Sequence, residues 1–104
     1  MEIEKRERRK TINTLPKTIR VAVTGEDIAR GEAKSVFTCP VAQSLHKQFP
    51  DFDMWVGYLF CTIQNRNNPQ NGVVLYRNSR RMRQFIDRFD GGKEVKPSSF
   101  ILRE

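Results

Sequence analysis

The apolar residues of this chain follow two different spacings, and the spacing predicts its elements. In residues 18–24 apolar side chains alternate with polar or small ones, which is typical of a half-buried strand: Ile19, Val21 and Val23. Thr24 is a favourable N-cap for a short helix from Glu26 to Arg30. Gly31 can end that helix in a left-handed conformation. We therefore expect a strand followed directly by one short helix.

Two longer segments have the spacing of an amphipathic helix. The first begins at Pro40, has Cys39 as its N-cap and runs to Gln48. Its apolar side consists of Val41, Ala42, Leu45 and Phe49. The second is capped by Ser79 and ended by the two glycines at 91–92. Its apolar side consists of Met82, Phe85, Ile86 and Phe89.

Three further segments have the composition of strands. Residues 54–64 are aromatic and β-branched, with apolar residues on both alternating faces, which predicts one long central or interface strand. The turn-rich residues 65–72 join it to a strand at 73–77, so these two strands form an antiparallel hairpin with a long tip. Residues 98–103 form the last strand and can pair with the first.

The element order β-α-α-β-β-α-β predicts the α+β class. We expect a small antiparallel or mixed four-stranded sheet with about three helices packed largely on one face. Residues 1–17 lack a sustained apolar period and are predicted to form a basic N-terminal arm, mobile or partly helical. Residues 18–104 form a single domain, because a chain of 104 residues with 38% apolar composition has room for one core.

The composition excludes several classes of protein. The chain has no run of about 20 apolar residues, and its charged start is unlike a signal peptide, so we predict a cytoplasmic protein with no membrane partner. Its two cysteines form no CxxC pair and it has one histidine, which excludes a structural zinc site and leaves little for acid–base chemistry. We expect no metal, no cofactor and no enzymatic activity.

The net charge of +7 is concentrated in two segments. Residues 1–20 hold seven basic and three acidic side chains, and residues 77–88 hold five arginines and one aspartate. On the last predicted helix, arginines point away from the apolar face, where guanidinium groups can bind phosphates. The candidate nucleic-acid contacts are Arg6, Arg8, Arg9, Lys10, Arg77, Arg80, Arg81 and Arg88. An acidic protein surface as partner, or a solvated helix face without a ligand, explains the same pattern.

Cys39 is the candidate for a reactive thiol. A thiol at a helix N-terminus faces unpaired N–H groups and the positive end of the helix dipole, which lower its pKa. A free cysteine is more often a small buried residue, and we weigh this structural role above the catalytic one. Ser44 and His46 lie two residues apart on one helix, so their side chains diverge and cannot form a nucleophile–base pair.

Three aromatic residues, Trp55, Tyr58 and Phe60, lie on the predicted long strand. They could stack on bases, as in sheet-based RNA-binding proteins. A role in the core or in self-association is favoured, because both faces of the strand are apolar. Three short helices leave one apolar face or edge of the sheet open, and such a surface usually marks a contact with a partner. We therefore predict a homodimer.

An ordered set of short motifs extends over residues 19–103. It consists of Asp27-Ile28-x-x-Gly31, then Cys39-Pro40-Val41-Ala42-x-Ser44-Leu45, then Arg83-x-Phe85-Ile86-x-x-Phe89-Asp90-x-Gly92-x-x-Val95-x-Pro97-x-x-Phe100-x-Leu102. The set resembles a group of small proteins encoded in phage and actinobacterial genomes that have no assigned biochemical function. The resemblance implies a viral or bacterial origin and a shared small fold, with no catalytic residues to carry over. The basic arm and the Asn-rich hairpin tip depart from the pattern of that group.

Three functions follow from these patterns. The leading hypothesis is a small non-enzymatic phage or bacterial binding module, a homodimer, whose basic surface engages nucleic acid or a nucleic-acid-processing complex. The alternative is an interaction or inhibitor protein that sequesters a host factor through the aromatic strand and the Asn-rich tip. The least favoured is a thiol-dependent protein that uses Cys39. Salt-dependent affinity for a polyanion separates the first hypothesis from the others.

Overall fold

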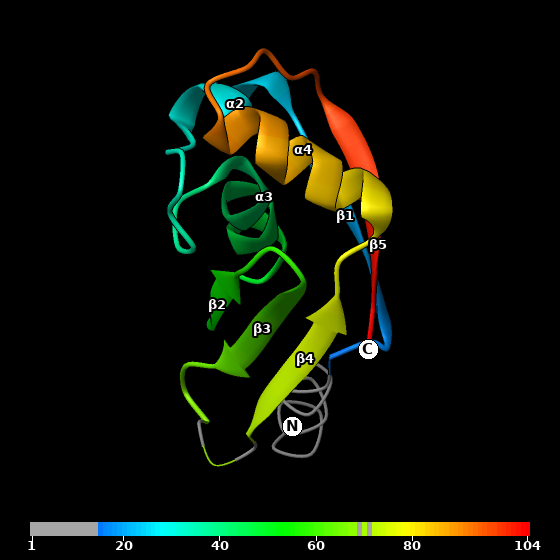
Figure 1. The fold of residues 1–104 in the computed structure, drawn as a ribbon. Coiled ribbons are helices and arrows are strands. Elements are labelled where there is room, and N and C mark those ends of the chain that lie inside the picture. Colours follow the sequence, from blue (N-terminus) through cyan, green and yellow to red (C-terminus); the bar gives the residue numbers. More distant parts are fainter. Residues whose placement is uncertain (1–14, 69, 71) are drawn as a thin grey trace.

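The computed structural model describes residues 15–68, 70 and 72–104 and shows the predicted α+β class (Figure 1). The elements follow in the order β1 (Thr18–Val23), α2 (Gly25–Arg30), α3 (Pro40–Gln48), β2 (Phe52–Val56), β3 (Phe60–Asn65), β4 (Val73–Arg77), α4 (Arg80–Asp90) and β5 (Ser98–Arg103). Most of the predicted arm lies outside the described residues. No helix within the described ranges is long and apolar enough to cross a membrane.

The strands form one antiparallel sheet of five strands in the order β1-β5-β4-β3-β2. The predicted pairing of the first strand with the last is confirmed, from Thr18 opposite Arg103 to Val23 opposite Ser98. β4 pairs with β5 through Arg77 and Arg103. The sheet therefore consists of a β2-β3-β4 meander and a β1-β5 pair that meet at these two arginines (Figure 1).

Helix α3 packs against both edge strands of this sheet, β1 and β2. The Ser44 hydroxyl donates to the carbonyl of Ala22, and the Gln48 side-chain amide donates to the carbonyl of Arg20, each at 2.7 Å. At the other edge of the sheet, the Val56 N–H donates to the carbonyl of Val36 at 2.8 Å. Backbone groups of both edge strands thus have partners outside the sheet.

The prediction of one long strand over residues 54–64 is wrong. β2 ends at Val56 and β3 begins at Phe60, and in the tight turn between them the Gly57 N–H donates to the Phe60 carbonyl at 2.9 Å. The turn gives the sheet five strands instead of four. It also changes which side chains share a face. Those that face the core are Met54, Val56, Cys61 and Ile63, and those left exposed or half-exposed are Trp55, Tyr58, Leu59 and Phe60.

The three helices begin and end close to the predicted residues. Thr24 caps α2 in a reciprocal pair of hydrogen bonds with Asp27, and Ser79 caps α4 by accepting a backbone N–H of its first turn. Gly31 ends α2 with φ −72°, not in the predicted left-handed conformation. Glycine is needed there for space, because a Cβ would lie 2.6 Å from the ring of Pro40.

The core lies between α3, α4 and the inner face of the sheet (Figure 1). Its largest fully buried side chains include Leu45, Met54, Ile63, Tyr76, Met82 and Leu102. The Tyr76 hydroxyl donates to the carbonyl of Pro16 at 2.6 Å and so fixes the segment that leads into β1. Burial raises the pKa of Tyr76 to about 12, with a further contribution from Glu104. On the opposite face of the sheet, here called the outer face, none of the described helices α2, α3 and α4 packs (Figure 1).

Candidate nucleic-acid interface

Four strands contribute side chains to one row across the outer face. Arg77 of β4 lies opposite Phe60 of β3 on one side and opposite Arg103 of β5 on the other. Arg103 in turn lies opposite Thr18 of β1. All four side chains are exposed. The sheet therefore places two arginines side by side, next to an aromatic ring.

Arg77 and Arg103 form a like-charge pair, and no carboxylate of the described residues makes an ion pair with either of them. Like charges that lie directly opposite each other on paired strands destabilise the pairing. The ion pairs among the described residues join other cations to acids: Arg30 to Glu26, Lys47 to Asp27 and Arg66 to Asp53. An anion bound between Arg77 and Arg103 would relieve this repulsion.

Arg80 extends the positive charge from the sheet to the start of α4. It lies three residues beyond Arg77 and is exposed, and within the described part of the chain no carboxylate pairs with it. The first turn of α4 contains no acidic residue, so the positive end of the helix dipole is not offset there. The guanidinium groups of Arg77, Arg80 and Arg103, here called the arginine cluster, make no ion pair with the described carboxylates and are of the type that binds phosphate groups.

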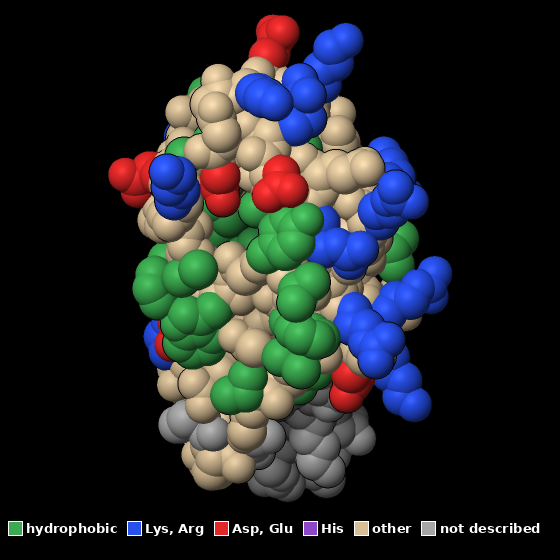
Figure 2. All heavy atoms as spheres, viewed as in Figure 1, with side chains coloured by type: hydrophobic (Ala, Val, Ile, Leu, Met, Phe, Trp, Pro, Cys, Tyr) green, Lys and Arg blue, Asp and Glu red, His purple; other side chains and the backbone are tan. Residues whose placement is uncertain are grey.

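Exposed apolar side chains cover the surface beside this cluster. Figure 2 shows hydrophobic side chains across the middle of the view, with lysines and arginines along the right side. The most exposed of the large apolar side chains are Phe37, Tyr58, Leu59, Phe60, Val73 and Leu75, here called the apolar face. Phe37 also contacts half-buried Trp55 edge to face, at 6.1 Å between ring centroids. The predicted aromatic strand thus brings its rings to the surface, not to the core.

A buried asparagine holds the turn that presents these rings. The side-chain amide of Asn78, which is 3% exposed, donates to the carbonyls of Gly57 and Tyr58 at 2.7 and 2.8 Å. The Asn78 N–H donates to the carbonyl of Leu59 at 2.9 Å. Asn78 therefore binds the backbone carbonyls of all three turn residues, while the side chains of Tyr58 and Leu59 remain exposed. Because the turn is already ordered, little conformational entropy would be lost when a ligand binds to it.

The structure divides the predicted arginines among different surroundings. Arg77 and Arg80 are exposed and belong to the arginine cluster. Arg81 donates to the carbonyl of Ser99 at 3.3 Å, and Arg88 donates to the carbonyl of Glu94 at 3.1 Å, so both turn toward the segment around β5. They do not join Arg80 in one outward group on α4. The remaining predicted contacts, Arg6, Arg8, Arg9 and Lys10, lie outside the described residues.

Cys39 is the N-cap of α3, as predicted, but its thiol does not have the lowered pKa expected of that position. Its side chain makes no capping hydrogen bond and is buried. Burial raises the pKa of Cys39, and this outweighs the helix N–H groups of Ala42 and Val41, which favour the thiolate. Cys61, also buried, donates its thiol to the Asn78 side-chain carbonyl at 3.0 Å and has a pKa raised to about 12. The structural role of both cysteines is favoured.

We expect both thiols to resist alkylation in the folded protein at neutral and mildly alkaline pH. The reason is that only the thiolate reacts, and burial disfavours it at both positions. Mass spectrometry after treatment with iodoacetamide measures this, with Cys39→Ala and Cys61→Ala to assign each thiol. The same treatment in concentrated urea is the control and should label both. Rapid labelling of Cys39 in the folded state would restore the thiol-dependent hypothesis.

Sequence reasoning missed two residues of this interface. Arg103 was not a candidate, because its place beside Arg77 depends on the β4-β5 pairing between distant segments. Its position in the alternating pattern of β5, on the same face as Ile101, was the available sign that it faces outward. No sequence feature indicated the role of Asn78, since an asparagine between a strand and a helix is typical of a loop.

Comparisons with known proteins add nothing to this geometry: no protein family, no curated protein and no solved structure matches the chain. Within the described residues no group of three or more histidine, cysteine, aspartate or glutamate side chains could hold a metal ion. The resemblance to small phage and actinobacterial proteins stays a prediction.

Proposed function

We propose that this protein is a small non-enzymatic binding module, of phage or bacterial origin, that engages single-stranded nucleic acid through its outer face. The observation that supports this most strongly is the exposed pair Arg77 and Arg103, two cations that face each other across two strands and have no ion-pair partner among the described carboxylates. Such a pair costs free energy in the absence of an anion. A phosphate backbone supplies that anion.

The neighbours of the pair favour a single strand over a duplex. Phe60 continues the row beyond Arg77 and is 42% exposed, and Tyr58 is exposed in the adjoining turn. Unstacked bases bind aromatic rings of this kind, whereas the bases of a duplex are already stacked on each other. The phosphates would bind the arginine cluster, and the bases would stack on Phe60 and Tyr58 of the apolar face. Because rings contact the flat surface of any base, the module would show little sequence preference.

The test is the affinity for a fluorescent single-stranded oligonucleotide, measured by anisotropy over a series of salt concentrations. We expect the logarithm of the affinity to fall linearly with the logarithm of the salt concentration, since bound arginines release counterions from the strand. Arg77→Gln should weaken binding about 10-fold and flatten this slope.

Arg30→Gln is the matched control for that measurement. It removes the same charge from an exposed arginine on α2, where Arg30 already pairs with Glu26. Its affinity and slope should stay close to those of the unaltered protein. Weak binding that does not respond to salt, or equal losses in the two variants, would contradict the proposal.

A second candidate function is supported by the apolar face. Leu59 and Phe37 are more than half exposed, at 55% and 53%. The N–H of Asn78 donates to the carbonyl of Leu59 and so holds the turn in place. Rigid exposed apolar groups of this kind are typical of contacts between proteins, either in a homodimer or with a host factor. Sedimentation of the chain alone over a range of concentrations separates a homodimer from a monomer. Self-association lost in Leu59→Asp but unaffected in Arg77→Gln would assign the apolar face to a protein contact.

A further inference from the structure

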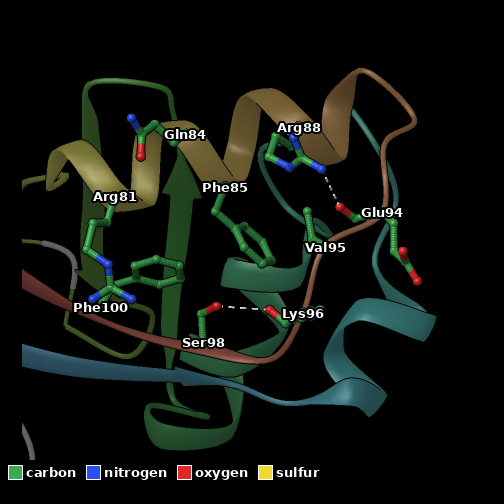
Figure 3. Close-up of a pocket in the computed structure, with 9 residues that line it drawn as sticks. All are labelled: Arg81, Gln84, Phe85, Arg88, Glu94, Val95, Lys96, Ser98 and Phe100. Atoms are coloured by element: carbon green, nitrogen blue, oxygen red, sulfur yellow. Dashed lines mark hydrogen bonds between the residues drawn. The ribbon is translucent and has the colours of Figure 1, made fainter.

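A pocket lies between α4 and the segment that leads into β5 (Figure 3). Its volume is about 350 Å³, at the small end of the range for ligand sites. Arg81 and Arg88 line its two ends, Lys96 lines it from the other segment, and Phe85, Val95 and Phe100 form its apolar wall. Three cations thus surround an apolar surface.

The two arginines of the pocket are held in place but keep most of their hydrogen-bonding capacity. Arg81 donates to the carbonyl of Ser99, and its guanidinium lies 5.7 Å from the ring centroid of Phe100. Arg88 donates to the carbonyl of Glu94. Each guanidinium carries five N–H donors, so most remain free for a ligand. An anchored guanidinium loses less side-chain entropy on binding, which favours affinity.

No carboxylate neutralises these cations among the residues that the structure describes. Glu94 lines the pocket, but the hydrogen bond to Arg88 uses its backbone carbonyl, and in Figure 3 its carboxylate points away from that arginine. The pocket therefore has a net positive charge. An anionic ligand is expected, since guanidinium groups bind phosphate oxygens in bidentate fashion.

The apolar wall favours a ligand that contains a planar ring as well as an anionic group. The rings of Phe85 and Phe100 pack edge to face at 5.4 Å between centroids, and Val95 lies beside Phe85 in the pocket. Phe85 and Phe100 are largely buried, at 7% and 4% exposed, so the part of the wall open to a ligand is small and centres on half-buried Val95. Inorganic phosphate would leave this part in contact with water, whereas a planar ring would cover it. Arg81 and Arg88 lie seven residues apart, or roughly 10 Å along the helix, so they reach opposite ends of one ligand.

We propose that this pocket binds one nucleoside monophosphate unit. The phosphate lies on one guanidinium, the base lies over Val95 and the small exposed part of Phe85, and the second guanidinium donates to the edge of the base. The unit is either a free nucleotide or the terminal nucleotide of a strand. This site goes beyond the proposed function, because it uses neither the outer face nor the arginine cluster.

The test is a titration of isotope-labelled protein with adenosine 5′-monophosphate, followed by amide chemical shifts. Saturable shifts are expected at Phe85, Val95 and Ser98, with weaker binding of adenosine and of inorganic phosphate, because each supplies only one half of the ligand. Arg81→Ala and Arg88→Ala should each weaken binding about 10-fold. Arg30→Ala is the matched control: it removes an exposed arginine of α2 that neither lines the pocket nor belongs to the arginine cluster, and it should leave the affinity unchanged.

The outcomes also separate this proposal from the proposed function. Absence of saturable binding, equal affinities for the monophosphate and for inorganic phosphate, or equal losses in Arg30→Ala and Arg88→Ala would overturn the pocket proposal. Arg77→Gln should weaken oligonucleotide binding without changing the affinity for the monophosphate. A strand with a 5′-phosphate that shifts the pocket amides at lower concentration than the free nucleotide would identify the strand end as the source.

Discussion

Replacement of Asn78 by alanine is expected to lower the free energy of unfolding by about 3 kcal/mol. The side chain makes two part-buried hydrogen bonds, to the carbonyls of Gly57 and Tyr58, and accepts a buried one from the thiol of Cys61. Alanine leaves both carbonyls and the thiol without these partners in a place that water reaches poorly. Urea unfolding followed by Trp55 fluorescence measures the change.

Asn67→Ala is the matched control for this prediction. Asn67 is exposed, at the tip of the β3-β4 hairpin, so its loss should change stability by less than about 0.5 kcal/mol. Asn78→Asp keeps an acceptor for Cys61 but replaces the amide donor with a carboxylate, so it should be at least as destabilised as the alanine variant. A loss below about 1 kcal/mol in Asn78→Ala would show that the turn between β2 and β3 does not depend on this residue.

Reversal of one charge in the arginine pair is expected to have opposite effects on binding and on stability. Arg77→Glu removes a phosphate contact and places a repulsive charge beside the strand, so affinity for a single-stranded oligonucleotide should fall on the order of 100-fold at low salt. The new glutamate lies opposite Arg103, where the cross-strand pair becomes attractive. The free energy of unfolding should therefore rise by about 0.5 kcal/mol. Anisotropy and urea unfolding measure the two effects on the same sample.

The double variant Arg77→Glu with Arg103→Glu completes this test. It restores a like-charge pair of opposite sign, so the gain in stability should disappear while binding stays weak. Retention of affinity in Arg77→Glu would remove the arginine cluster from the proposed function.

The elements predicted correctly are those that local chemistry determines. Thr24, Ser79 and Pro40 mark helix starts through their own backbone and side-chain preferences, and the structure places all three as predicted. The hairpin turn at Gly57 was missed because apolar residues continue on both sides of it. Asn78, 21 residues away from Gly57, hydrogen-bonds this turn, and such a contact leaves no mark in a local pattern.

The candidate site could be predicted only in part for the same reason. Charge density pointed to Arg77 and Arg80, but their partner Arg103 comes from the end of the chain through sheet pairing. For Cys39 the position was predicted correctly and the direction of its pKa was not. A helix N-terminus lowers the pKa of a thiol and burial raises it, and the sequence shows the first influence but not the extent of the second.

The contacts of Ser44, Gln48 and Val36 with the outermost strands affect how copies of this chain can associate. Sheets with open borders grow by adding strands from other molecules, which leads to domain swapping and fibrils. Here the carbonyls of Arg20 and Ala22 and the N–H of Val56 are already occupied by the chain itself. A strand from another molecule would first have to displace these hydrogen bonds. This favours association through side chains over open-ended polymerisation through the strands.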